Sequence, residues 1–172
     1  MLEWTITVND PTPPIDADDD DDERWMRLAL DEAHAAHARG DWPTGAVLVR
    51  DGRLLGRGAN RQVTRGDVTA HAEPEALRDA FAAHGPDAAR GATLYCTMEP
   101  CPMCAGALAL GGVRRLVLGL RHARLRRSDL GDYGIEAFCR LTGFELALRE
   151  GVLGDECLAL RRRWGGDRVH PA

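Results

Sequence analysis

The sequence predicts an α/β fold, a three-layer α/β/α sandwich around a five-stranded mixed sheet. Three observations support this prediction. An Asp-Gly pair between two short apolar runs indicates an antiparallel hairpin. After this hairpin, helical and strand patterns alternate along the chain, which is typical of a sheet covered by helices on both faces. A helix separates the last two predicted strands, strands 4 and 5, which are therefore expected to run parallel.

Hydrophobic periodicity and turn residues place the elements of the first half of the chain. Apolar residues recur at helical spacing up to Gly40, which supplies a stop. The pair Asp51-Gly52 is the strongest short hairpin signal. The predicted elements are a helix over 23–39, strands over 45–50 and 53–58, a loop over 60–68 and a helix over 70–84.

The second half of the chain continues with strands and helices in turn. The predicted elements are a strand over 93–96, a helix over 102–110, a strand over 113–119, an arginine-rich loop over 121–131, a helix over 133–141, a strand over 144–148 and a closing helix over 155–164. The connection between the last two strands is about twenty residues long, enough for a crossover to a parallel strand.

Length and composition fit one soluble globular domain. The chain has 172 residues, of which 44% are apolar and 28% charged, and it shows no apolar run of membrane length and no secretory signal. Five cysteines, an odd number in a chain large enough to fold without disulfides, favour a reducing compartment. We therefore expect a cytoplasmic protein. Residues 1–22 combine prolines with an aspartate run and predict a flexible acidic arm before a folded domain over 23–172.

Two short motifs carry the residue types of a metal site. His71-Ala72-Glu73 and Pro100-Cys101-Pro102-Met103-Cys104 each open a predicted helix. Zinc prefers imidazole and thiolate ligands, and a catalytic site supplies three of them and leaves the fourth position to water. Cys101 and Cys104 lie three residues apart at a helix start, so both thiols face one side. His71, Cys101 and Cys104 are therefore the predicted ligands of one Zn²⁺ per chain.

Glu73 is the candidate catalytic acid and base. It lies two positions from His71, a spacing that suits contact with a metal-bound water, whose pKa zinc lowers to about 7 in well-studied sites. The alternative interpretations of a CxxC pair are half of a structural zinc site or a redox pair. The first needs a fourth Cys or His nearby, and the second places its cysteines after the first strand of a βαβ unit; neither condition is met. Cys96, Cys139 and Cys157 lie in or beside apolar runs and are predicted to be packing residues.

The pattern HxE followed by PCxxC is known from zinc deaminases that act on nucleobases. With the segments PTGAVLVRDGRLLGRGANR, TAHAEPEAL, ATLYCTMEPCPMCAGAL and EGVLGDECLAL, the sequence resembles the cytidine deaminase-like superfamily over about residues 23–164. The similar branch contains tRNA adenosine deaminases, guanine deaminases and fungal-type cytosine deaminases. The resemblance implies that 23–172 is a zinc-dependent deaminase domain and that the protein is a homodimer. It also implies that Asn60 contacts the substrate, that Thr44 lines the pocket and that the Ala72 N–H binds a substrate heteroatom.

The substrate is less well determined by the sequence. Net charge of −5, the acidic arm and the lack of a basic tail favour a small amino-heterocycle, a nucleobase or nucleoside of the guanine or cytosine type, over a polyanion. Asp129, Asp132 and Tyr133 are similar to an acidic and aromatic cluster of guanine deaminases. The alternative is a tRNA adenosine-to-inosine deaminase, and a third hypothesis is a non-catalytic zinc-stabilised binding protein, against which Glu73 argues.

Two features leave alternatives open. An arginine-rich cluster after the fourth predicted strand either contacts phosphates of a tRNA or forms a solvated loop with scattered ion pairs, and we favour the second interpretation. Its members are Arg121, His122, Arg124, Arg126 and Arg127. Trp164 either covers a small-base pocket or closes the last helix against the core.

Overall fold

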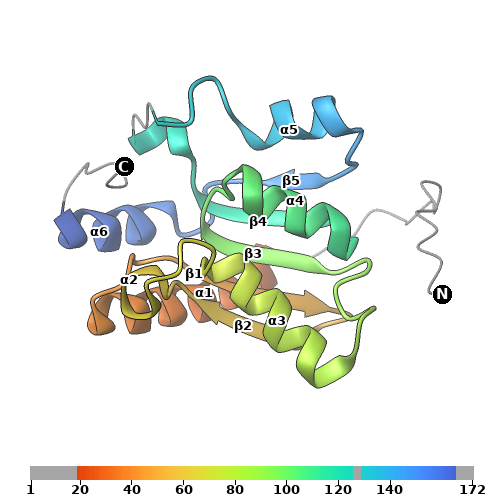
Figure 1. Ribbon diagram of the computed structural model, residues 1–172, viewed down its shortest axis with the longest axis horizontal. Helices are drawn as coiled ribbons and strands as arrows, with labels where there is room; N and C mark the ends of the chain where they lie inside the picture. Colours follow the sequence, from red (N-terminus) through yellow and green to blue (C-terminus); the bar gives the residue numbers. More distant parts are fainter. Residues whose placement is uncertain (1–18, 126–128, 166–172) are drawn as a thin grey trace.

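The computed structural model describes residues 19–125 and 129–165 (Figure 1). Its helices are α1 (Asp19–Arg39), α2 (Gln62–Arg65), α3 (Ala72–His84), α4 (Pro102–Gly111), α5 (Ile135–Thr142) and α6 (Gly154–Gly165), with the 3₁₀ helix η1 (His122–Leu125). The strands are β1 (Gly45–Arg50), β2 (Arg53–Ala59), β3 (Thr93–Met98), β4 (Arg115–Leu120) and β5 (Ala147–Arg149). The strand order is β2-β1-β3-β4-β5. β1 is antiparallel to both neighbours, whereas β3, β4 and β5 are parallel, so the predicted mixed sheet is confirmed.

The predicted hairpin joins β1 and β2. Asp51 and Gly52 both have positive φ angles, 52° and 66°. Two consecutive residues with positive φ match the right-handed twist of paired strands, and Asp-Gly is a favoured pair for such a turn. The turn therefore fixes the register in which Arg50 lies opposite Arg53.

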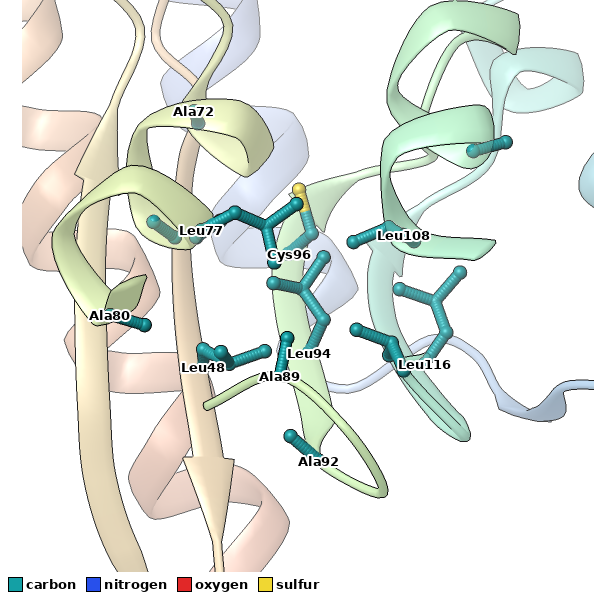
Figure 2. Packing of buried hydrophobic residues seen from close by; sticks show 14 of the residues in the cluster. Leu48, Ala72, Leu77, Ala80, Ala89, Ala92, Leu94, Cys96, Leu108 and Leu116 are labelled. Carbon is teal, nitrogen blue, oxygen red and sulfur yellow. The ribbon is translucent and has the colours of Figure 1, made fainter. Parts of the chain in front are cut away.

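Two hydrophobic clusters, one on each face of the sheet, give the molecule its three layers. Alternate strand residues point to opposite faces, as Leu48 and Val49 do in β1. One face packs against α3, α4 and α5, and part of this cluster is shown in Figure 2. The other face packs against α1 and α6. The predicted α/β/α sandwich is therefore confirmed (Figure 1).

Helix α1 begins at Asp19, four residues before the predicted start at Glu23. The cause is a long-range ion pair: Asp22 is fully buried and accepts hydrogen bonds from Arg115 at 2.6 and 2.8 Å and from Arg149 at 2.7 Å. A buried carboxylate is stable only when it is paired in this way. Asp22 thus belongs to the folded domain, while a flexible arm remains a prediction for residues 1–18, which lie outside the described residues.

Two other elements differ from the sequence-based expectation. α2 forms inside the predicted loop over 60–68, because the Asp41 carboxylate accepts the backbone N–H groups of Val63 and Thr64 at 3.0 and 2.9 Å. β5 begins at Ala147 instead of residue 144, since Phe144 and Leu146 pack against the core without joining the sheet. In both places a contact from a distant part of the chain decides the local structure.

Gly58 sets how closely α3 approaches the sheet. A Cβ atom at this position would overlap the backbone of Ala72 and Ala76 on α3. We expect Gly58→Ala to lower the free energy of unfolding by about 2 kcal/mol or more, because two backbone segments would have to separate. Urea unfolding measures this change. Gly106→Ala is the control: a Cβ atom there meets no neighbour within 4 Å, so stability should be equal or higher. Equal stability of the two variants would contradict the prediction.

Candidate metal centre

The two predicted motifs lie at the starts of two helices that cover the same face of the sheet. His71 is the N-cap of α3 and Cys101 is the N-cap of α4, and both have extended backbone angles. Pro102 occupies the first turn of α4, where its missing N–H has no intrahelical partner. The close approach of α3 to Gly58 and the direct passage from β3 into the Cys101 loop bring the two helix starts together.

The side chains of the two motifs form a compact triangle. Nδ1 of His71 lies 3.6 Å from Sγ of Cys101 and 3.4 Å from Sγ of Cys104, and the two sulfur atoms are 3.6 Å apart. Within residues 19–125 and 129–165, this is the one group of three His, Cys, Asp or Glu side chains that is arranged to bind a metal ion. The structure therefore brings together all three predicted ligands.

The triangle has the dimensions of a zinc site. Bonds of about 2.3 Å to sulfur and about 2.1 Å to nitrogen at tetrahedral angles place two ligand atoms about 3.5 to 3.8 Å apart. The observed separations of 3.4 to 3.6 Å agree with this geometry. Hydrogen bonding with Cys104 and His71 also holds the pKa of Cys101 far below its usual range, at about 3, although burial alone would raise it. The lowered pKa favours the thiolate form of Cys101.

Glu73 lies next to this triangle in a buried position. Its carboxylate oxygen Oε2 has no hydrogen-bond partner among the described residues. Burial raises the pKa of Glu73 to about 7. An unpartnered buried carboxylate oxygen is costly, and its presence beside three potential ligands indicates a partner such as a water molecule at the metal position. The residues present therefore fit a three-ligand zinc site with an adjacent proton acceptor.

Comparison with known proteins identifies the family. Residues 19–120, more than half of the chain, match the model of the cytidine and deoxycytidylate deaminase zinc-binding region. The chain belongs to this family. The match includes both motifs, so the predicted superfamily and the zinc-binding deaminase domain are confirmed.

The similar proteins are named either as tRNA adenosine deaminases or as guanine deaminases. The chain is 50% identical over 95 residues to the tRNA-specific adenosine deaminase of Agrobacterium fabrum, a match that covers 55% of this chain and 62% of that enzyme. A solved structure from work on A-to-I editing by tRNA:A34 deaminases matches with a TM-score of 0.70 and 38% identity, over 80% of this chain and 98% of the other. The guanine deaminase of Nitrosomonas europaea matches with a TM-score of 0.73 and 29% identity, over 83% of each chain.

The predicted substrate contacts lie at the start of β1, the end of β2 and the start of α3. The Thr44 carbonyl accepts the N–H of Asn60 at 2.9 Å, and the next N–H, of Arg61, bonds to Ala70, which precedes His71. The Asn60 carboxamide is buried and hydrogen-bonded to Gln62. Ala72 is buried at the first position of α3. The roles of Thr44, Asn60 and Ala72 in substrate binding stay predictions.

The cysteines outside the motifs are packed into the protein as free thiols. Cys96 and Cys157 are buried and Cys139 is half-buried. Cys96 points into the cluster formed with Leu77, Leu94 and Leu108 (Figure 2). Burial raises the pKa of Cys96, so its thiol stays neutral.

Ion pairs occupy the arginine-rich cluster where the structure describes it. Arg121 contacts Glu99, Glu136 and Glu150 at 3.4, 2.6 and 3.4 Å, and Arg124 contacts Asp155 at 2.6 Å. These contacts support the interpretation as an ion-paired loop for Arg121 and Arg124. Arg126 and Arg127 lie outside the described residues.

Trp164 packs onto α1 and the loop before β1. Its ring lies 5.8 Å from the rings of both His37 and Trp42, and the Arg161 guanidinium stacks on Trp42 at 4.4 Å. These contacts support the interpretation that Trp164 closes the last helix against the core.

The sequence analysis missed Glu99, although it directly precedes Pro100 and Cys101. This side chain is only 3% exposed at the end of β3. The available signal was an acidic residue directly after a largely apolar strand, because such a carboxylate needs several donors when buried.

Proposed function

We propose that the protein is a hydrolytic deaminase that converts adenosine in tRNA to inosine. The observation that carries this proposal is the match to tRNA deaminases over most of the chain: 38% identity with a TM-score of 0.70 across 98% of the solved tRNA:A34 deaminase. The relatives therefore favour the tRNA alternative over the small-molecule substrate that the charge indicated. The predicted homodimer and cytoplasmic location stay predictions, and no described helix is long and apolar enough to cross a membrane.

The site residues have the chemistry for this reaction. His71, Cys101 and Cys104 would bind the zinc ion, which as a Lewis acid lowers the pKa of water. Glu73 accepts one proton from the attacking water and delivers it to a ring nitrogen, and then carries the second proton, from the hydroxyl group formed on the ring carbon, to the departing amine. The water oxygen forms a bond to the ring carbon, the carbon–nitrogen bond breaks, and ammonia leaves. Burial of Glu73 keeps this proton transfer away from bulk solvent.

The negative net charge does not oppose binding to RNA once its origin is considered. Four of the 27 acidic residues, and none of the 22 arginines, lie in residues 1–18, ahead of α1. Residues 19–172 therefore carry 23 acidic residues against 22 arginines, a net charge of −1. A domain that is close to neutral can bind a phosphate backbone through a local group of arginines even when the whole chain is acidic.

A free-base deaminase is the second candidate. The observation in its favour is the TM-score of 0.73 with the guanine deaminase, slightly higher than that with the tRNA enzyme. The lower identity, 29% against 38%, ranks this candidate second.

A substrate panel tests the two candidates. We expect the zinc-loaded protein to convert adenosine to inosine in a tRNA anticodon stem-loop, with an apparent affinity that falls as salt rises. Guanine, cytosine, adenine and their nucleosides are the comparison substrates, and product mass and released ammonia are the measurements. A stem-loop with guanosine in place of the target adenosine is the matched control. Turnover of a free base or nucleoside without turnover of the stem-loop would contradict the proposal.

A further inference from the structure

A buried carboxylate that the proposed chemistry does not use lies two residues before Cys101. Oε2 of Glu99 accepts the backbone N–H of His122 at 2.8 Å, and Oε1 accepts the backbone N–H of Ile135 at 3.0 Å. Nε of Arg121 lies 3.4 Å from Oε2. Each oxygen of this carboxylate therefore has a donor from a different part of the chain.

The partners of Glu99 are the two ends of one connection. His122 begins η1 and Ile135 begins α5, so a single side chain binds the first and the last turn of the segment between β4 and α5. A third contact lies beside it: the Tyr133 hydroxyl donates to the Pro100 carbonyl at 2.7 Å. The segment is thus attached to Glu99 and Pro100, the two residues that lead directly into the Cys101 loop.

This attachment depends on a carboxylate. Both donors are backbone N–H groups at helix starts, which have no intrahelical partner. A buried donor without an acceptor is costly, and a carboxylate accepts at both oxygens. A glutamine side chain has the same shape, but one oxygen is replaced by an NH₂ group that would face a donor in either orientation. Packing alone would not distinguish the two side chains.

We propose that Glu99 is a positioning residue, whose carboxylate fixes the ends of the segment between β4 and α5 against the metal-ligand loop and so holds Tyr133 against Pro100, beside Cys101, where it can contact a substrate of the proposed reaction. The effect on substrate binding rests on the proposed function. The attachment itself does not, because it can be measured without turnover. Glu99 touches neither metal nor substrate in this proposal and acts through the segment that it binds.

Amide hydrogen exchange of the zinc-loaded Glu99→Gln variant tests the attachment. We expect exchange at the N–H of His122 or Ile135 to be at least about tenfold faster than in the wild type, because one of the two acceptors is lost. The N–H of Val117, in the middle of β4, should keep its wild-type rate. Zinc content should stay at the wild-type level, because the predicted ligands are unchanged. Unchanged exchange at both amides would overturn the proposal.

Kinetics test the positioning. For the stem-loop, we expect the KM of Glu99→Gln to rise about tenfold and kcat to change by less than about threefold. Asp22→Asn is the matched control. The Asp22 carboxylate is also buried, but it lies near the first residues of β3 and β4, where Thr93 pairs with Arg115, whereas Glu99 follows the last residue of β3. Loss of the Asp22 carboxylate should lower stability and leave KM unchanged. Faster exchange in Glu99→Gln with an unchanged KM would make Glu99 purely structural and would also overturn the proposal.

A second variant and a second substrate test the proposal if the first measurements fail. If Glu99→Gln does not fold, Tyr133→Phe removes only the hydroxyl that bonds to Pro100, and we expect a rise in KM of about threefold with kcat retained. An unchanged KM in this variant overturns the proposal. If the wild type turns over another member of the substrate panel instead of the stem-loop, the proposed function is wrong, and the KM comparison for that substrate decides the role of Glu99.

Discussion

The Glu73→Gln variant is expected to keep its fold and its zinc and to lose at least about a hundredfold in kcat. The amide has the same shape as the carboxylate, so the first turn of α3 and the position of His71 should not change. It cannot accept a proton from the attacking water, which is the step assigned to Glu73. Single-turnover kinetics with the stem-loop, together with zinc analysis and the thermal midpoint of unfolding, measure the three quantities.

Glu75→Gln is the control for this variant. Glu75 lies in the same turn of α3, but it faces Arg65 and Arg78 in ion pairs instead of the metal triangle. Its kcat should stay within about threefold of the wild type, since ion pairs of this kind contribute little. Near-normal turnover in Glu73→Gln would remove Glu73 from the mechanism, and equal losses in both variants would indicate a general disturbance of α3.

The sequence predicted those parts of the molecule that depend on local patterns. The Asp51-Gly52 turn needs only two residues with positive φ, and both motifs open helices whose starts are marked by their own residues. The grouping of His71, Cys101 and Cys104 could be predicted because zinc sites use few residue types and need them in a fixed number. The ligand triangle is therefore the best-predicted feature of the structure.

The features that could not be predicted depend on contacts between distant segments. α2 exists because Asp41 supplies acceptors from twenty-two residues away, and α1 is extended because Asp22 pairs with Arg115 and Arg149 across the sheet. Neither contact leaves a periodic pattern. The role of Glu99 was hidden for the same reason, because its donors follow 23 and 36 residues later.

The substrate preference shows a different limit of sequence reasoning. Net charge of the whole chain indicated a small substrate, but −4 of the total of −5 comes from residues 1–18, ahead of α1. Charge acts over about 10 Å at moderate salt, so the sign near the site matters more than the total. A count taken separately for the arm and for the domain would have weakened the preference for a small molecule.

Replacement of any one ligand by alanine is expected to remove most of the zinc. His71→Ala, Cys101→Ala and Cys104→Ala each leave two protein ligands, and a catalytic zinc site needs three. We expect zinc after gel filtration to fall from about one per chain to below about a tenth. Because metal binding is coupled to folding, the thermal midpoint should fall as well. Elemental analysis and thermal unfolding are the measurements, and deamination should be lost with the metal.

Cys96→Ala is the sharpest control for the ligand variants, because it removes a thiol from the same region without touching the triangle. Cys96 is buried among Leu77, Leu94 and Leu108, and the metal-binding group of the described residues does not include it. Its replacement should cost about 1 kcal/mol of stability through a small cavity and leave zinc at about one per chain. Full zinc in His71→Ala or Cys101→Ala would refute the ligand assignment. Zinc loss in Cys96→Ala would instead make Cys96 a ligand, although it is not among the three side chains whose ligand atoms lie within 4.8 Å of one another.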